Sequence, residues 1–352
     1  MRENNMITKR KMAVIEDYGK MKIVECDLPP MRSKDLLIKI DACNLCTSEY
    51  GIYSGVRKAG FPYTFGHEWV GTVVETGDEV TRFKKGDRVV GCYEYDAESL
   101  PAQLADSSTA PRKYSFTEMN EDGFYGRFRA CADYLVQPEV CTFTMNKDLD
   151  ISEAAFLEPL ATVCCGIKRL QLKPTDKVLV IGAGTMGILN ALVAKAYGST
   201  VFQSEMMPKK IEAARQLGID CIDVDGKDPI EEIPKVSGIQ GFDVVIVAVG
   251  VSSAYDQAFK LLKQHEGKVL FFAAGFPEPK MSISPNEIHY RKLEIIGTYT
   301  ANFADFMEAS ELLSTRKINV SALVEARYPF EKIDEAMKKA NEPGTFRVSV
   351  VM

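Results

Sequence analysis

Hydrophobic and polar residues follow two different patterns along the chain, and the first is that of short strands. Runs rich in Val and Ile, separated by Gly and Asp, occupy residues 11–19, 35–43, 69–77 and 86–91. Runs of this length and composition, bounded by turn residues, are typical of β-strands. The first part of the chain is therefore predicted to be β-rich.

The second pattern begins at Ser152, where a helix is predicted over residues 152–170. Beyond it, apolar runs alternate with amphipathic ones, at 177–184, 186–198, 200–205, 208–218, 242–250, 253–263 and 268–275. Such alternation predicts a parallel sheet with helices on both faces. After one more helix, over 304–318, the tail at 326–352 returns to a strand, and we expect it to rejoin the first domain. The fold class is thus α/β, with a β-rich domain and a doubly wound parallel sheet.

The segment 93–126 follows neither pattern. It contains several Ser and Pro and a series of acidic residues, namely Glu94, Asp96, Glu98, Asp106, Glu118, Glu121 and Asp122. A stretch of this length without periodicity is uncommon inside a compact domain. We expect an irregular lobe or a partly ordered loop, which shapes a ligand cleft or a subunit contact.

Composition narrows the class of protein. The 352 residues and 46% hydrophobic content suffice for two domain cores. The net charge of −6, without a basic stripe, argues against nucleic acid as a partner. The N-terminal residues lack the apolar core of a secretory signal, and the longest apolar run, at 178–196, contains three glycines and an Asn, so no membrane span is expected. The nine cysteines are scattered and do not resemble a disulfide framework, which favours a soluble, cytoplasmic protein.

A glycine motif carries the first functional prediction. GAGTMG, at residues 182–187, directly follows the apolar strand and opens the next helix, which is the setting of a dinucleotide-binding turn. The helix N-terminus there offers oriented N–H groups to a pyrophosphate. The residues predicted to bind the cofactor in this region are Gly182, Gly184, Thr185, Met186, Gly187, Glu205 and Lys210.

Glu205, at the end of the next strand, bears on the choice of cofactor. Its carboxylate can accept hydrogen bonds from ribose hydroxyls and would repel a 2′-phosphate, so NAD is favoured over NADP. Lys209 and Lys210 weaken that preference. The alternatives are that the glycines are ordinary turn residues and that Glu205 is a solvated acid at a strand end.

A second group of residues suggests a metal site. Cys46 follows the strand predicted at 35–43, His67 lies in the sequence FGHEWVG, and Glu68 and Glu158 complete the set. A thiolate, an imidazole and carboxylates suit zinc, and three protein ligands with one open position are typical of a catalytic site. The alternative for His67 is a hydrogen-bonded core histidine.

These residues carry a resemblance to a known family. The stretches that resemble it are CTSE at 46–49, PYTFGHEWVGTVVETGDEVTRFKKGDRVVG at 62–91, FLEPLATVCCGIKRL at 156–170 and VLVIGAGTMGILNALVAKAYG at 178–198. In this order they look like the zinc-containing medium-chain dehydrogenase/reductase superfamily, nearest to its sorbitol and threonine dehydrogenase group. The resemblance implies a GroES-like catalytic domain from residues 1–157 and 298–352, a Rossmann NAD-binding domain from 158–297, and an active site in the cleft between them.

The resemblance also implies roles for individual residues. Cys46, His67 and Glu68 match the family's catalytic zinc ligands, and Glu158 matches a carboxylate that binds the zinc directly or through water. Ser48 would begin a proton relay, while Glu49 and Glu158 would orient the site. Thr298 and Arg347 would line the cofactor or serve structural roles.

Two departures from the family pattern lead to further predictions. Only Cys92 stands where relatives with a structural zinc carry four cysteines, so one catalytic zinc and no structural zinc is expected. Gly51 stands where the proton relay often ends in a histidine, so the proton must leave through water, a substrate hydroxyl or another group. Cys43 and Cys46 also form a C-x-x-C pair, but the surrounding sequence lacks the pattern of a redox motif.

Together these features predict an oxidoreductase that transfers a hydride from a secondary alcohol to NAD. The substrate would be a polyol, a sugar alcohol or an amino-alcohol, and a homodimer or homotetramer is expected from the family. The alternatives are a zinc-free, NADPH-dependent reductase of the same superfamily and a non-catalytic NAD-binding protein. The sequence does not select one alcohol, because substrate loops vary freely on one scaffold.

Overall fold

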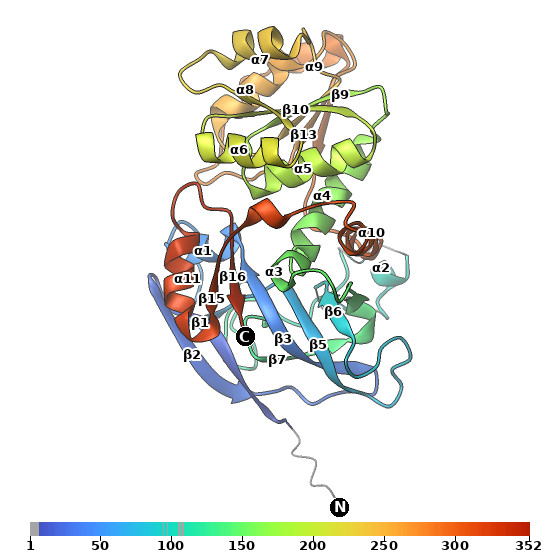
Figure 1. Ribbon diagram of the computed structural model, residues 1–352, viewed down its shortest axis with the longest axis vertical. Helices are drawn as coiled ribbons and strands as arrows, with labels where there is room; N and C mark the ends of the chain where they lie inside the picture. The colour runs from blue at the N-terminus through green and yellow to red at the C-terminus, as the bar shows by residue number, and fades with distance from the viewer. Residues whose placement is uncertain (1–6, 94, 97, 105–106, 108) are drawn as a thin grey trace, which may run out of the picture. The chain divides into compact units, whose positions relative to one another are not determined.

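The computed structural model describes residues 7–352 except 94, 97, 105–106 and 108. The chain forms two compact units (Figure 1). The first comprises Met1–Glu158, Asn302–Arg316 and Val324–Met352, and the second comprises Pro159–Ala301 and Lys317–Leu323. The division thus falls near the predicted boundaries, but residues 298–301 and the segment Lys317–Leu323 belong to the second unit rather than the first.

The first unit contains two sheets. A three-stranded antiparallel sheet has the order β2-β1-β4, from Lys20–Asp27, Lys9–Asp17 and Tyr63–Thr64. A seven-stranded sheet has the order β15-β16-β3-β5-β6-β8, with β7 paired to β3. Its strands are β3 (Asp35–Leu45), β5 (Glu68–Thr76), β6 (Arg88–Gly91), β7 (Tyr134–Pro138), β8 (Thr142–Thr144), β15 (Val324–Pro329) and β16 (Arg347–Val351). The C-terminal tail therefore joins the β-rich unit, as predicted, because β16 pairs with β3.

The hydrophobic core of this unit is continuous across its sheets. Ile38, Ile40, Phe65 and Val348 are almost fully buried in one cluster. The helices and turns of the unit are α1 (Thr47–Tyr53), α2 (Leu100–Gln103), η1 (Glu139–Cys141), α3 (Ile151–Ala154), α10 (Phe303–Ser314), η3 (Phe330–Lys332) and α11 (Ile333–Ala340). Helix α11 packs against β15 and β16 of the seven-stranded sheet and against β2 of the three-stranded sheet (Figure 1).

The helix predicted over 152–170 is divided in the structure. Helix α3 ends at Ala154, and α4 begins at Leu157 and runs to Leu170. The division has a simple cause in Pro159, which lacks an N–H and is tolerated in the first turn of a helix but not in its interior. Glu158 is consequently fixed in the first turn of α4.

The segment 93–126 is an irregular lobe, as far as the structure describes it. Its described residues include the short α2 and the isolated bridges Tyr95↔Arg112 and Tyr63↔Tyr125. Two of the acidic residues noted in the sequence, Glu94 and Asp106, lie outside the described residues. A role of this lobe in a cleft or a subunit contact stays a prediction.

The second unit is a doubly wound parallel sheet of six strands in the order β11-β10-β9-β12-β13-β14. The strands are β9 (Lys177–Ile181), β10 (Thr200–Glu205), β11 (Asp220–Asp223), β12 (Val244–Val247), β13 (Lys268–Phe271) and β14 (Glu294–Gly297). Its helices are α4, α5 (Thr185–Ala196), α6 (Pro208–Gln216), α7 (Pro229–Ser237), α8 (Ser252–Leu261), α9 (Pro285–Arg291) and η2 (Ser321–Leu323). This strand order, 3-2-1-4-5-6 within the unit, is that of the Rossmann fold, so the predicted fold class is confirmed.

Among the described residues, no helix has both the length and the apolar character that crossing a bilayer requires.

Candidate metal centre and dinucleotide site

The three predicted metal ligands come from the ends of two neighbouring strands. Cys46 follows β3 and is the N-cap of α1, while His67 directly precedes β5 and Glu68 is its first residue. Strands β3 and β5 are antiparallel, and their register pairs Asn44 with Glu68. The end of β3 therefore lies beside the start of β5. The loop that carries Cys46 and the loop that carries His67 are thus close in space although they are far apart in sequence.

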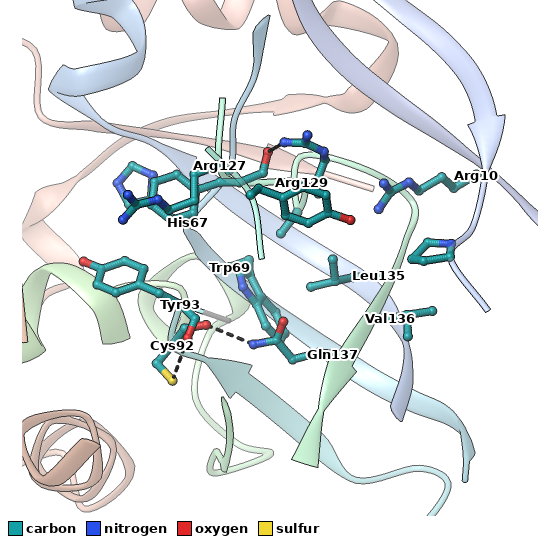
Figure 2. Close-up of a pocket in the computed structure, with 15 residues that line it drawn as sticks. Arg10, His67, Trp69, Cys92, Tyr93, Arg127, Arg129, Leu135, Val136 and Gln137 are labelled. Carbon is teal, nitrogen blue, oxygen red and sulfur yellow. Dashed lines mark hydrogen bonds between the residues drawn. The ribbon is translucent and has the colours of Figure 1, made fainter. Parts of the chain in front are cut away.

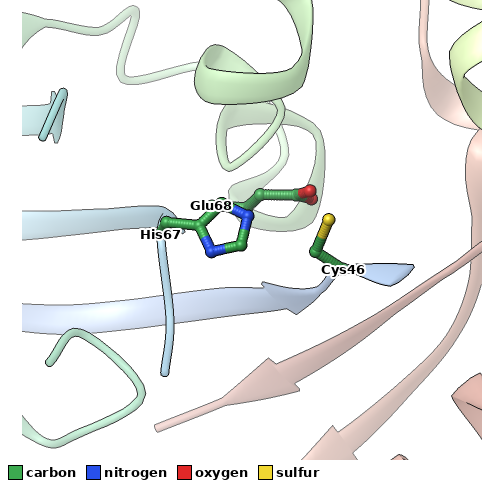
Figure 3. A group of neighbouring side chains, drawn as sticks. All are labelled: Cys46, His67 and Glu68. Carbon is green, nitrogen blue, oxygen red and sulfur yellow. The ribbon is translucent and has the colours of Figure 1, made fainter. Parts of the chain in front are cut away.

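The side chains of these residues converge (Figure 3). One ligand atom each from Cys46, His67 and Glu68 lies within 4.8 Å of the other two. His67 and Glu68 are buried, and Cys46 is partly exposed. Because zinc ligands lie about 2.0–2.3 Å from the ion, donors at these separations can meet on one ion with small rotations of the side chains. Within the part of the chain that the structure describes, no other group of three or more His, Cys, Asp or Glu side chains is placed to hold a metal ion.

Glu49 holds both metal-binding loops in place. Its Oε2 accepts a hydrogen bond from the backbone N of Cys46 at 2.9 Å, and its Oε1 accepts one from the backbone N of Gly66 at 2.9 Å. The same Oε1 lies 3.1 Å from Nδ1 of His67, at ion-pair distance but without the alignment of a hydrogen bond. Glu49 is thus a positioning residue that ties the thiolate loop to the imidazole loop.

The electrostatic environment of His67 is negative. Burial by itself lowers the pKa of this imidazole, but Glu49, Glu158 and Cys46 together raise it well above its usual range. A positive charge at this position is therefore stabilised. The same negative groups would favour a divalent cation, which would compete with the proton for the ring nitrogen.

Glu158 lies next to the three ligands rather than among them. Its Oε2 is 4.0 Å from Nε2 of His67, and its Oε1 accepts a hydrogen bond from the Tyr93 hydroxyl. Burial and the neighbouring carboxylate of Glu68 raise the pKa of Glu158, although His67 opposes them. This placement fits contact with a metal ion through a water molecule better than direct ligation. Nothing in the sequence links Tyr93 to Glu158.

Arg347 contacts the metal ligands, which the sequence did not indicate. From β16, its Nε donates to both carboxylate oxygens of Glu68, at 2.8 and 3.1 Å, and its Nη2 lies 3.6 Å from Sγ of Cys46. Burial lowers the pKa of this guanidinium, but Glu68 raises it above its ordinary value. Arg347 therefore neutralises part of the negative charge of the ligand group.

The proposed start of the proton relay is also next to Cys46. Ser48 lies in α1 and is half-buried. At Gly51, where the family often has a histidine, a Cβ atom would meet the side chain of Arg57 at 3.5 Å. Arg57 therefore packs against the position at which a relay histidine would begin, and a guanidinium cannot pass on a proton because it does not deprotonate in proteins.

The remaining cysteines are free thiols. Cys43 shares a hydrogen bond with Cys131, which raises the pKa of its thiol, so its contact is not with Cys46 of the C-x-x-C pair. Burial raises the pKa of Cys92, and a hydrogen bond with Cys141 adds to the effect. Each of these pairs is buried among apolar strands and has the character of a core contact.

The glycine motif forms the turn that the sequence predicts. Gly182 follows β9 with φ +97°, a backbone conformation that favours glycine. Gly184 is the N-cap of α5. A Cβ atom on Gly187 would lie 2.0 Å from the carbonyl oxygen of Gly182, so only glycine allows α5 to pack this close to the turn. Thr185 and Met186 form the first turn of α5.

Glu205 faces this turn from the end of β10. Its Oε2 accepts a hydrogen bond from the backbone N of Ala183 at 2.8 Å. Its Oε1 accepts from the backbone N atoms of Met206 and Met207, at 2.8 and 3.1 Å. The carboxylate is thus fixed at the edge of the glycine turn, where the dinucleotide-binding fold places its ribose-binding acid.

Two other predicted cofactor residues lie outside the turn. Lys210 is half-buried in α6. Thr298 follows β14, and its Cγ2 lies 3.3 Å from the Cβ position of Gly166 in α4. Thr298 therefore packs on α4, and its role toward a cofactor stays a prediction.

The fold and the site together define a class of protein. The second unit is a dinucleotide-binding domain with its glycine turn and terminal acid, and the first unit carries a thiolate, an imidazole and a carboxylate arranged for a metal ion. Two family models match the chain: zinc-binding dehydrogenase over residues 185–315, and alcohol dehydrogenase GroES-like domain over residues 32–145. Together they span more than half of it. The chain belongs to the zinc-containing medium-chain dehydrogenase/reductase superfamily, in its sorbitol and threonine dehydrogenase-like branch.

Individual relatives agree with this assignment. A sorbitol dehydrogenase of Halalkalibacterium halodurans is 27% identical over 90% of this chain and 92% of its own. An L-threonine 3-dehydrogenase of Shewanella putrefaciens is 28% identical over 92% of this chain and 93% of its own. Among solved structures, a Sinorhizobium meliloti 1021 protein assigned as a zinc-binding dehydrogenase and bound to NADP is 25% identical, with a TM-score of 0.85 over 98% of this chain and 100% of its own.

Proposed function

We propose that this chain is a zinc-dependent dehydrogenase that oxidises a secondary alcohol of a polyol, a sugar alcohol or an amino-alcohol with NAD. The observation that carries the proposal is the convergence of donor atoms from Cys46, His67 and Glu68 within 4.8 Å. The substrate class is drawn from relatives that act on sorbitol and on threonine. Both of those compounds bear a second polar group beside the carbinol.

The chain offers a donor set that fits one zinc ion. Cys46, His67 and Glu68 would hold it, and Glu158 would approach it with a water molecule between them. A bound zinc ion supplies Lewis acidity, which lowers the pKa of an alcohol hydroxyl. The redox chemistry itself is that of the nicotinamide.

The protein's own residues would then position the donors and move the proton. Glu49 and Arg347 fix the orientations of the ligand side chains, as second-layer partners commonly do at metal sites. Ser48 would receive the hydroxyl proton. Because Arg57 packs at Gly51, the proton would leave Ser48 through water or a substrate hydroxyl rather than through a side chain at that position.

The preference for NAD rests on Glu205. Its carboxylate already lies at the glycine turn, where it would accept hydrogen bonds from ribose hydroxyls and repel a 2′-phosphate. The Sinorhizobium meliloti protein is bound to NADP, so the preference needs its own test. We expect kcat/KM to be higher with NAD than with NADP. Glu205→Ser should reduce the ratio of these two kcat/KM values by about tenfold or more.

The principal test removes one ligand. In Cys46→Ala we expect zinc content, measured by mass spectrometry, to fall below one ion per chain and turnover to fall by roughly 100-fold or more. Turnover is read as NAD reduction in a screen of polyols, sugar alcohols, inositols, threonine and 2,3-butanediol. Cys26→Ala, in β2, is the matched control and should behave as the parent chain.

Unchanged turnover in Cys46→Ala would contradict the proposal. A parent chain that holds no zinc and reduces activated double bonds with NADPH would instead support the zinc-free reductase. Tight NAD binding without turnover on any alcohol would support a non-catalytic protein.

A second copy of the chain is the proposed protein partner, in a homodimer or homotetramer. Support comes from β14, the edge strand of the Rossmann sheet, and from apolar side chains exposed near it. Tyr290 and Tyr299 are 72% and 84% exposed, and Ile295 is 38% exposed. An exposed strand edge with apolar side chains favours pairing with another strand, and a two-fold axis lets the same edge serve both copies.

A further inference from the structure

A pocket in the first unit lies against the metal ligands but extends away from them (Figure 2). It is lined by residues of β1, β5 and β7, by His67, and by residues 92–93, 114 and 127–130. In the view of Figure 2, His67 and Tyr93 lie at one end and Arg10 at the other. The lining is unusual in its charge, because it includes three arginines, Arg10, Arg127 and Arg129.

Arg10 occupies a position that a strand normally gives to an apolar residue. In β1, Lys9 and Lys11 are exposed, whereas Arg10 alternates with them and faces inward with Met12 and Val14. Its exposed fraction is only 4%. Its Nε is buried, and nothing in the described part of the chain accepts a hydrogen bond from it.

Arg127 adds a second guanidinium whose charge is not balanced. Its Nε is likewise buried without a hydrogen-bond partner among the described residues, and its guanidinium lies over the ring of Phe116, 4.9 Å from the ring centre. Neither Arg127 nor Arg10 forms an ion pair with a described carboxylate. Burial and then the nearby charge of Arg127 lower the pKa of Arg112, as expected for a guanidinium that lies close to another one.

Arg129 lies in the same pocket, but its positive charge is paired with a carboxylate and its donors have acceptors. Its Nε and Nη2 donate to the carboxylate of Asp122 at 3.0 and 3.2 Å. Its Nη1 donates to Thr64 Oγ1 and to the carbonyl oxygen of Gly126. The carboxylate of Asp122 is therefore already used, and it leaves the charges of Arg10 and Arg127 unmatched.

A buried guanidinium without an anionic partner, as at Arg10, is unfavourable, because it stays charged and its donors lose their contact with water. Arg127 is partly buried, and its Nε shares this loss of contact with water. The cavity has a volume of about 40 Å³, which exceeds the minimum for one water molecule and suits a group of a few heavy atoms. Carboxylates and phosphates match the planar fork of a guanidinium. We propose that this pocket is a binding site for a small oxyanion group, a carboxylate or a phosphate.

The anion has two sources. Because His67 and Tyr93 line the same pocket and Tyr93 contacts Glu158, the group we favour is the acidic end of the alcohol substrate, and this assignment rests on the proposed function. The other source is a free anion from solution. The oxyanion site itself does not depend on the proposed function.

The first experiment measures anion binding directly. Sulfate, as a stand-in for a phosphate group, is titrated into the whole chain at constant ionic strength with chloride as the balancing ion, and binding is followed by calorimetry and thermal unfolding. We expect saturable stabilisation of the parent chain, and an apparent sulfate Kd that rises about tenfold or more in Arg10→Met and in Arg127→Gln. Arg169→Gln removes one exposed charge on α4 and should leave the sulfate Kd unchanged.

Two further variants keep the result interpretable. Arg10→Lys retains the charge at the buried position, so it should fold and keep measurable sulfate binding even if Arg10→Met does not fold. Cys46→Ser removes a metal ligand and should leave sulfate binding intact, which separates the pocket from any metal-bound anion. Absence of saturable sulfate binding in the parent chain, or equal binding in Arg127→Gln and the parent, would overturn the proposal.

The second experiment identifies the source of the anion. The best alcohol from the screen is oxidised with sulfate as inhibitor, and each alcohol is paired with its carboxylate analogue, such as sorbitol with gluconate. Competitive inhibition, and a KM for the acid that rises about tenfold in Arg10→Met while the KM for the neutral alcohol does not, would assign the site to the substrate. Sulfate binding without competition would assign it to a free anion and still support the oxyanion site.

Discussion

Single residues with several partners hold the metal ligands in place, and Glu49 is the clearest case. It accepts hydrogen bonds from the backbones of Cys46 and Gly66 and lies at ion-pair distance from His67. One carboxylate therefore sets the relative positions of two ligand-bearing loops. Its replacement should affect metal affinity more than overall folding.

We expect Glu49→Gln to lower zinc affinity by about 10- to 100-fold, because the partner that orients His67 loses its charge. The free energy of unfolding should fall by about 1–3 kcal/mol, because one buried backbone N–H loses a charged acceptor. Zinc affinity is measured by competition with a chromophoric chelator, and stability by urea denaturation. Glu335→Gln, on the exposed face of α11, is the control. Equal zinc affinity in the two variants would argue against the positioning role.

The buried pair of Arg347 and Glu68 supports a second prediction at this scale. In the presence of a chelator, Arg347→Met should lower the free energy of unfolding by about 3–5 kcal/mol, because it leaves the carboxylate of Glu68 buried and unpaired. With zinc present the loss should be smaller, because the ion supplies the missing positive charge. The double variant Arg347→Met/Glu68→Leu should be more stable in chelator than Arg347→Met alone. A double variant as unstable as the single one would contradict this account.

At the scale of elements, two glycines in the turn between β9 and α5 have different roles. Gly187→Ala would place a Cβ atom 2.0 Å from the Gly182 carbonyl oxygen, whereas a Cβ atom on Gly184 would meet nothing within 4 Å. Gly184 also has an ordinary φ of −68°. Gly187 therefore allows close helix packing, and Gly184 leaves open space beside the turn.

We therefore expect Gly187→Ala to destabilise the protein by about 1–3 kcal/mol through overpacking and to weaken NAD binding as well. Gly184→Ala should leave the unfolding transition nearly unchanged but weaken NAD binding by about tenfold or more, because the pyrophosphate approaches the backbone there. Thermal unfolding and fluorescence titration with NADH measure the two effects. A Gly184→Ala variant that binds NADH as the parent does would place the pyrophosphate elsewhere.

The elements also show what the sequence could and could not predict. The Rossmann unit could be predicted because its strands and helices alternate regularly. Cys46 and His67 could be predicted as site residues because each adjoins a predicted strand. The contacts of Glu158 with Tyr93 and of Glu68 with Arg347 join residues 65 and 279 positions apart. Such contacts depend on strand register, which a single sequence does not specify. They also depend on the break that lets α4 begin at Leu157, which Pro159 could have indicated. The inward position of Arg10 follows from the alternation in β1, but its lack of a partner required coordinates.

At the scale of the whole molecule, the exposed edge of the Rossmann sheet makes a prediction about assembly. We expect light scattering to give the mass of a dimer or tetramer for the parent chain, and Ile295→Lys to shift the population toward monomer, because a charge at the strand edge opposes pairing. Val236→Lys, at a 56% exposed position on α7, is the control. A monomeric parent chain, or equal masses in both variants, would contradict assembly through β14.

The order of strands in the first unit has a consequence for biosynthesis. Strand β16 follows every other strand in sequence, yet it lies inside the sheet between β15 and β3, and it carries Arg347. During translation, β9 to β14 emerge before β16 and can pair with one another, while the sheet of the first unit still lacks an inner strand and Glu68 still lacks its guanidinium. A nascent chain at that stage would hold a nucleotide-binding unit but an unfinished metal centre. The metal centre therefore becomes complete only after the last strand has been synthesised and has entered the sheet between β15 and β3.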